Sequence, residues 1–270
     1  MLIFIAFISK SQQFIPFKAQ DVDKTLGLAE TKKNLLECQV LGIGGVSDLN
    51  DAKKLGGNLS LGAYVLLRTQ SNDDRFRRHA IYVFYNSRAG STEDTVVVAK
   101  TYLFPDIGKR DFTLGYEWLL GHENSIFTLI PFSEISFTRN ILNRNEQDPE
   151  KFHAYNFTFG MKLKLETDFT VGSEMKRFGI SLNPYVQSIS IDPKDFKTRN
   201  EMLNEKDLPP TFHTIGVYSA LQIAELGIFA NYKRIMNKTE AFTDKNLKDG
   251  ILVIGLLVGT DIFKFSKKRE

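Results

Sequence analysis

The side chains best suited to catalysis or metal binding are four histidines, and their spacing supports neither role. They lie near the ends of expected strands and are His79, His122, His153 and His213. No pair has the His-x-x-x-His spacing of a zinc motif, and Cys38 is the single cysteine, so a cysteine-based metal centre and a disulfide framework are excluded. We therefore expect no metal and no cofactor.

A serine hydrolase would need a serine beside a histidine and an orienting group. The pairs that come nearest are His122 with Ser125 and His213 with Ser219. A chain of this length offers such pairs without any function attached to them. We predict no catalytic residues, and an outer-membrane lipid-modifying hydrolase is the least favoured hypothesis.

Composition excludes two further classes of protein. The net charge is +3 over 270 residues, and lysines and arginines are scattered among carboxylates, so we expect no nucleic-acid partner. The mean hydropathy is -0.20. After the N-terminus no window holds the roughly 18 consecutive apolar residues that a membrane helix needs. A helical membrane protein is therefore the second class excluded.

The clearest structural signal is the alternation in residues 155–166. One side of this expected strand carries the residues that we interpret as lipid-facing: Tyr155, Phe157, Phe159, Met161, Leu163 and Leu165. The other side carries polar and small residues: Asn156, Thr158, Gly160, Lys162, Lys164 and Glu166. Such a strand suits a sheet between lipid and water, although a half-exposed soluble sheet produces the same pattern.

Similar runs, separated by Asp, Asn, Gly, Pro and Lys, predict strands at 58–69, 78–88, 94–104, 111–121, 125–139, 151–166, 173–191, 211–224, 227–237 and 250–265. Pro184 falls within one of them and predicts a bulge. The connections at 89–93, 122–124, 167–172 and 225–226 are short. Those at 70–77, 105–110, 140–150, 192–210 and 238–249 are mostly longer and more polar, so a meander would have tight turns at one end and long loops at the other.

These observations predict an all-β fold, a single antiparallel up-and-down transmembrane β-barrel of 10–12 strands. The barrel domain is expected over 58–265, followed by a charged C-terminal tail at 266–270. Residues 14–57 form either an N-terminal extension or the first two strands, and the even strand number of bacterial barrels leads us to favour twelve strands over ten. Residues 1–13 are interpreted as a truncated signal peptide, with an N-terminal strand or buried segment as the alternative.

The charged residues expected to line the lumen are Arg68, Lys100, Glu117, Lys162, Lys164 and Glu166. In one interpretation they surround water and set an ionic preference. In the other they pair across the interior and fill it, which is usual for narrow barrels. We favour the second interpretation because ten to twelve strands enclose little space.

Over residues 36–265 the chain resembles the small outer-membrane β-barrel proteins of Gram-negative bacteria, and its Lys/Asn/Phe-rich texture is similar to those of the Bacteroidota. Phe263 and Phe265 resemble the terminal aromatic residue that such proteins present for assembly, although residues 266–270 follow them. The resemblance implies a place in the cell outer membrane with lipid as a partner. It also implies a structural, interaction or narrow-transport role, with other envelope proteins as candidate partners.

A secreted soluble β-barrel that binds an apolar ligand inside is the alternative. It requires the reverse orientation, with Phe157, Phe159 and Met161 inside and Lys162 and Lys164 in water. Which face of residues 155–166 is buried therefore separates the two hypotheses.

Overall fold

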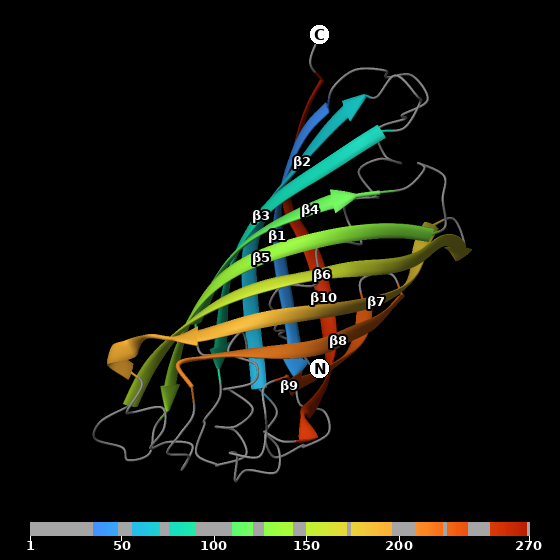
Figure 1. The fold of residues 1–270 in the computed structure, drawn as a ribbon. Coiled ribbons are helices and arrows are strands. Elements are labelled where there is room, and N and C mark those ends of the chain that lie inside the picture. The colour runs from blue at the N-terminus through green and yellow to red at the C-terminus, as the bar shows by residue number, and fades with distance from the viewer. Residues whose placement is uncertain are drawn as a thin grey trace.

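The chain folds into a closed antiparallel β-barrel, as Figure 1 shows. This computed structural model describes residues 35–47, 56–70, 76–89, 110–120, 127–142, 150–171, 174–195, 209–223, 226–236 and 249–268. The strands are β1 (Leu35–Ser47), β2 (Gly56–Gln70), β3 (Phe76–Ala89), β4 (Arg110–Leu119), β5 (Phe127–Leu142), β6 (Glu150–Val171), β7 (Glu174–Ile191), β8 (Thr211–Ile223), β9 (Leu226–Ile235) and β10 (Ile251–Lys268), with the short helix η4 (Pro193–Asp195) after β7.

Each strand pairs with its neighbours in sequence, and β1 closes the ring by pairing with β10 from Leu35↔Lys268 to Ser47↔Gly255. The predicted single antiparallel up-and-down barrel is therefore confirmed. In the part of the chain that the structure describes, no helix is long and apolar enough to cross a membrane.

The wall differs from the expected one in its first strands. In the described part of the wall, β3 pairs directly with β4 from Arg78↔Leu119 to Ser87↔Arg110. Residues 94–104, like the candidate strand at 13–19, lie outside the described residues. β1 comes instead from the segment 14–57, and β10 runs to Lys268, so the ring has ten strands rather than the favoured twelve. Strand propensity measures how well a segment suits a pleated surface, and it does not assign that segment a neighbour.

The ten-strand ring places its longest connections at one of its two ends. Strands are joined at one end, here the turn end, by residues 71–75, 120–126, 172–173 and 224–225. At the other end, the loop end, the connections are 48–55, 90–109, 143–149, 192–210 and 236–250. The predicted asymmetry holds, but the connection near 70–77, predicted to be long, belongs to the turn end. Residues 90–93, predicted as part of a short turn, belong to the loop end.

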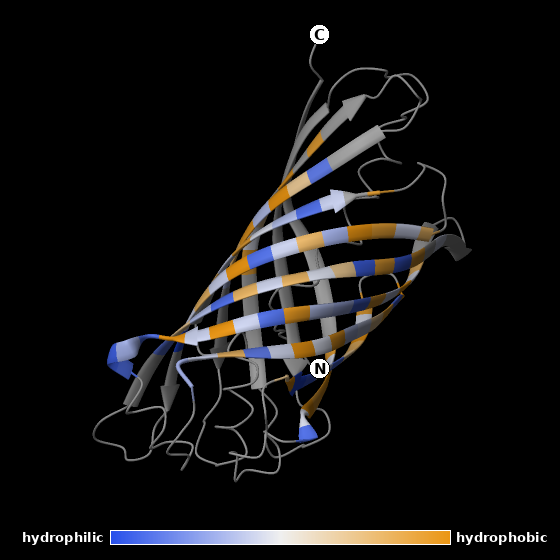
Figure 2. Cartoon of the chain, in the orientation of Figure 1, coloured by the Kyte–Doolittle hydropathy of each residue, from blue (hydrophilic) through white to orange (hydrophobic). Residues whose placement is uncertain are grey.

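Burial alternates along the strands with the opposite sense to that of a soluble protein. In β8 exposed and buried residues alternate over the whole length, and the exposed positions include Ile215, Val217 and Leu221. The buried positions between them include Thr214 and Gln222. Figure 2 shows the resulting bands of apolar and polar residues across the sheet. Large apolar side chains thus cover the outside, and the interior holds polar and charged side chains among aromatic rings such as Phe212 and Tyr218.

Glycines on the inner face give room to aromatic rings from the adjacent strand. Gly115 lies opposite Tyr82, and a Cβ placed on Gly115 would overlap the tyrosine ring. The same relation joins Gly216 to Tyr185 and Gly62 to Phe84. The interior is therefore packed by rings that lie across neighbouring strands, and this requires the absence of a side chain beneath them.

The bulge predicted at Pro184 is wrong. The β6–β7 ladder pairs Gly160 with Tyr185 on one side of the proline and Leu163 with Leu182 on the other, in the same register. Pro184 is exposed on the outer face and still lies opposite Val217 of β8. A proline in a strand removes one backbone donor, so the β6–β7 ladder is interrupted at Pro184. Neither strand has the extra residue that defines a bulge.

Replacing Gly115 with valine tests the packing of the interior. The added side chain must displace the ring of Tyr82, and we expect the free energy of unfolding to fall by about 1–3 kcal/mol. Urea unfolding in detergent micelles, followed by the change in gel mobility between folded and unfolded forms, measures this. Ala230→Val, at a half-exposed position on the outer face, is the matched control and should change stability by less than about 0.5 kcal/mol. Equal stability of the two variants would contradict the packing described.

Candidate functional site

The barrel interior contains three of the six charged residues expected there. Glu117, Lys162 and Lys164 are buried, with exposed fractions of 0 to 1 %. Arg68 lies in β2 and Glu166 in β6, but their side chains fall outside the described part of the structure, as does Lys100 altogether. The interior also contains Glu134 and Lys233, which the sequence analysis did not single out.

The residues expected to face lipid lie on the outer surface of β6. Phe157 is 51 % exposed, Phe159 56 % and Met161 39 %. Tyr155 and Leu165 are likewise exposed, and Leu163 is half-buried. The two faces of residues 155–166 thus lie inside and outside the barrel wall.

A buried ion pair joins two strands that are not neighbours. Lys162 of β6 donates from Nζ to Oε1 of Glu117 of β4, and both side chains are fully buried. The ammonium also lies 4.6 Å from the ring centroid of Phe132 on β5, the strand between them. Burying two charges has a large desolvation cost that direct pairing and a ring face only partly offset, so each charge depends on the other.

A tyrosine connects three consecutive strands beside this pair. Tyr82 of β3 lies across Gly115 of β4 and donates its hydroxyl proton to Oε1 of Glu134 on β5. The Lys162 ammonium is 5.6 Å from the centroid of the same ring. Glu117, Lys162 and Glu134 therefore share one network around Tyr82.

The same arrangement recurs on the opposite part of the wall. Tyr185 of β7 lies across Gly216 of β8, and its hydroxyl donates to Oδ1 of Asn231 on β9 at 2.9 Å. Lys233 donates from Nζ to Oε1 of Gln187 at 2.7 Å and lies 5.6 Å from the Tyr185 ring centroid. In both places, a glycine on the middle strand of three lets a tyrosine on the first strand reach a polar partner on the third.

Another row of interior groups is less well satisfied. Asn183, Tyr218 and Asn231 lie opposite one another on β7, β8 and β9. Both side-chain polar atoms of Asn183, the Tyr218 hydroxyl and Nδ2 of Asn231 are buried and have no hydrogen-bond partner in the described part of the chain. Because all of these side chains are at most 1 % exposed, the described inner face at this level presents no open surface to solvent.

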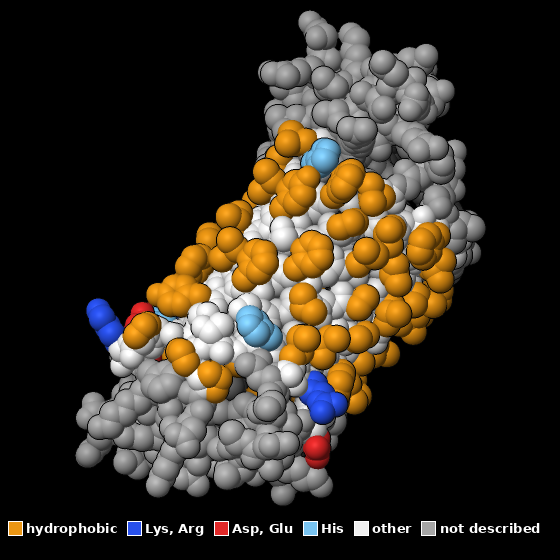
Figure 3. Space-filling model, in the orientation of Figure 1, with side chains coloured by type: hydrophobic (Ala, Val, Ile, Leu, Met, Phe, Trp, Pro, Cys, Tyr) orange, Lys and Arg blue, Asp and Glu red, His pale blue; other side chains and the backbone are white. Residues whose placement is uncertain are grey.

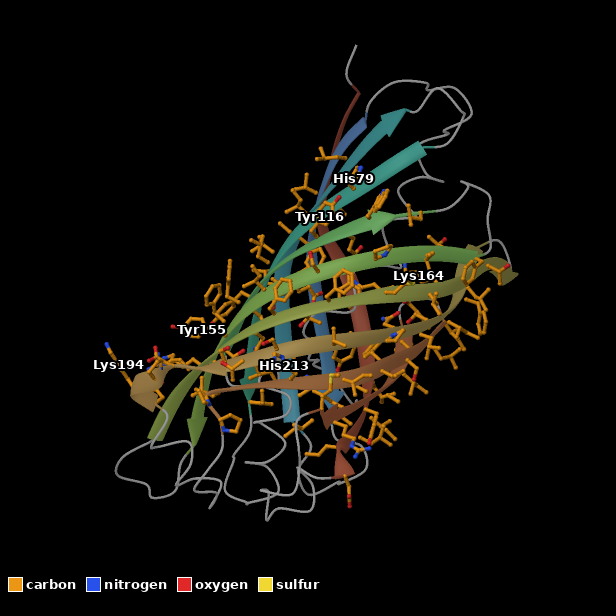
Figure 4. The ribbon with its side chains drawn as sticks, viewed as in Figure 1. His79, Tyr116, Tyr155, Lys164, Lys194 and His213 are labelled. Carbon is orange, nitrogen blue, oxygen red and sulfur yellow. The ribbon has the colours of Figure 1, made fainter. Side chains whose placement is uncertain are left out.

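The described histidines lie on the outer face near the two rims of the barrel. At the turn end, Nδ1 of His79 is 2.6 Å from the Tyr116 hydroxyl, and its ring stacks with Trp118 at a centroid distance of 6.2 Å. At the loop end, Nδ1 of His153 is 2.8 Å from Oδ2 of Asp195 in η4. Figure 4 shows His79 and Tyr116 toward one end, and Tyr155, Lys194 and His213 toward the other.

The histidine–serine pairs from the sequence do not form a catalytic site among the described residues. His213 and Ser219 lie on the same strand, about 20 Å apart at roughly 3.3 Å per residue. His122 and Ser125 lie outside the described residues. Within the described ranges, no three His, Cys, Asp or Glu side chains are grouped in a way that could hold a metal ion.

Two grooves on the outer face at the loop end were not predicted. One, of about 520 Å³, is lined by Phe157, Phe159, Val186, Ser188, His213 and Met236 among others. Its small floor residue Ser188 lies directly opposite His213 in the β7–β8 ladder. The second, of about 220 Å³, lies on β3 to β6. The lining of both grooves depends on the register between neighbouring strands. This register cannot be derived from a single sequence.

The sequence matches no known family model and no curated protein. Among solved structures, the translocator domain of the autotransporter NalP from Neisseria meningitidis is similar, with 10 % identity and a TM-score of 0.37 over 94 % of this chain and 92 % of that one. The transport unit of the autotransporter AIDA-I from Escherichia coli has 9 % identity and a TM-score of 0.24, over 94 % and 97 %. Both scores are low, and neither likeness bears on what this chain does.

The Glu117–Lys162 pair is testable by a double-mutant cycle. Glu117→Leu leaves Lys162 charged and buried without its partner, and we expect a loss of about 3–5 kcal/mol in unfolding free energy. The double variant Glu117→Leu with Lys162→Met removes both charges and should recover most of that loss. Urea unfolding of the four proteins measures the coupling, and additive effects of the two single changes would show that the charges do not depend on each other.

Proposed function

We propose that this chain is a β-barrel of the bacterial outer membrane, surrounded by lipid, whose interior is filled by its own side chains. It would act as a membrane anchor that presents its loop-end connections, and not as an open diffusion pore. The observation that carries this proposal is the reversed burial pattern, with large apolar side chains exposed outside and charged side chains buried inside. A closed barrel pairs every wall strand on both sides, which is the condition for a sheet to cross a bilayer.

The height of the apolar band supports a position across a bilayer. On β6 the outward residues are apolar from Tyr155 to Leu165, and Thr167 follows. At roughly 3.3 Å per residue these positions span about 33 Å along the strand. For a strand tilted by about 40° the band is about 25 Å tall, the height found in outer-membrane barrels.

The rims of this band have the chemistry of a membrane interface. Figure 3 shows apolar side chains over the middle of the outer face and charged or histidine side chains toward its ends. Tyr116 and Trp118 contact His79 near one rim, and Phe137 meets Tyr155 edge-on near the other at a centroid distance of 5.5 Å. Aromatic rings with polar edges suit the boundary between acyl chains and head groups.

The soluble alternative required the reverse orientation. Phe157, Phe159 and Met161 lie outside, whereas Lys162 and Lys164 are buried inside. The described interior packs charged side chains among its aromatic rings, so this structure gives the soluble hypothesis no support.

Narrow transport is the second candidate function, and the charge of the described interior is the observation that favours it. Lys162, Lys164 and Lys233 face inward with Glu117 and Glu134. A small excess of positive charge would favour anions if the interior opened. The packing of these side chains supports the anchor over this candidate.

Spin labels on the outer face test the position in the membrane. With Cys38 replaced by serine, a label at Phe159→Cys should collide with oxygen, which concentrates in lipid, and be protected from a water-soluble nickel relaxation agent. A label at Lys194→Cys, exposed in η4 at the loop end, is the control and should show the opposite preference. Recovery of the chain in solution without detergent, together with nickel access at 159, would contradict a lipid-embedded barrel.

Planar bilayers distinguish the anchor from narrow transport. We expect the purified protein to insert without stable single-channel current steps, because the described interior is packed. Reproducible steps that disappear on charge reversal at Lys162 and Lys164 would instead assign the interior a conducting role. Insertion is verified independently in vesicles of the same lipid, where the strands should be protected from protease.

A further inference from the structure

The smaller outer groove combines an aromatic floor with a cationic edge. Its volume is about 220 Å³, and it lies at the loop end on β3 to β6. Four outward aromatic residues form one cross-strand row in it: Tyr85, Phe112, Phe137 and Tyr155. Each is exposed by 43 to 47 %, so the row presents ring surface to whatever surrounds the barrel.

The next residues toward the loop end are basic. Arg139 of β5 lies directly opposite His153 of β6, and both line the groove. Arg139 is half-buried, and its Nε is buried with no hydrogen-bond partner among the described residues. A guanidinium donor left unpaired in a desolvated position is unfavourable, and phosphate oxygens are acceptors that match guanidinium geometry.

The carboxylates nearby lie on the other side of His153 and already have partners. Asp195 accepts from the His153 backbone N–H at 2.8 Å and contacts its Nδ1. Asp192 accepts from the Tyr155 hydroxyl at 3.4 Å and from the Lys194 backbone N–H at 3.0 Å. The described β5 side of the groove therefore presents a cation, the guanidinium of Arg139.

We propose that this groove binds a membrane lipid with a phosphate-bearing head group. The phosphate contacts the guanidinium of Arg139 beside His153, and an acyl chain lies over the row of aromatic rings. The position supports this ligand, because the groove crosses the border between the apolar band and the polar rim, where a lipid changes from chain to head group. The inference rests on the proposed function, since only a lipid-embedded barrel exposes this groove to lipid.

The larger groove on β6 to β9 lacks the feature that selects a phosphate. Its described lining is aromatic and aliphatic apart from Gln187, Ser188 and His213, and contains no arginine or lysine. Arg234, at the same rim on β9, is exposed but lines neither of these two grooves. It therefore serves as a matched control for charge at the rim outside the proposed site.

Native mass spectrometry of the full chain in detergent micelles tests the proposal with two lipids that have the same chains. Phosphatidylglycerol carries the phosphate, and diacylglycerol lacks it. We expect the wild-type protein to retain phosphatidylglycerol preferentially, and Arg139→Gln to weaken this retention about tenfold, as for loss of a charge-assisted hydrogen bond. Arg234→Gln should retain it as the wild type does.

Equal retention of the two lipids by the wild-type protein would overturn phosphate recognition without reference to any variant. Equal losses in Arg139→Gln and Arg234→Gln would assign the effect to the overall charge of the rim and overturn the site. The spin label at position 159 separates this failure from failure of the proposed function. Absence of a lipid site leaves that label in lipid, whereas a barrel that is not embedded exposes it to water.

Discussion

The structure depends on closure of the backbone hydrogen-bond ladder. Each strand has one row of donors and acceptors on each side, and an unpaired row next to lipid would be prohibitively unfavourable. Pairing of β1 with both β2 and β10 removes the last open edge. Once the ring is closed, each residue points either inward or outward with no intermediate choice. An even number of strands also brings the start of β1 and the end of β10 to the same rim.

A ring of ten strands leaves little interior volume, and the inner face reflects this. Large side chains lie flat across neighbouring strands, and glycines such as Gly115 and Gly216 leave the space for them. Tyr82 and Tyr185 each reach a polar partner two strands away in this manner. The hydroxyls of these two tyrosines are therefore satisfied laterally, around the wall. The lysines become part of this packing, which is why their presence inside does not by itself indicate a conducting pore.

The outer face has its chemistry at the borders of the apolar band. Neighbouring strands align polar residues into rows there, such as Arg139 beside His153, with Asp195 close to the histidine. The middle of the band is uniformly apolar, so the polar contacts of the proposed lipid site lie at these rims. His213 illustrates the role of register. Its neighbour is Ser188 on the adjacent strand, whereas Ser219 on its own strand is too far away to pair with it.

The sequence alone determined the class of fold and the face on which each side chain of 155–166 lies, because a strand alternates with a period of two residues. It also placed Glu117, Lys162 and Lys164 on the polar side of their strands. Only the tertiary structure decided that 35–47 enters the wall, that Glu117 meets Lys162, and that Arg139 lies beside His153. Alternation is a local property of the backbone, whereas strand order, register and cross-strand partners arise from pairing between distant segments, which a single sequence does not encode in any local pattern.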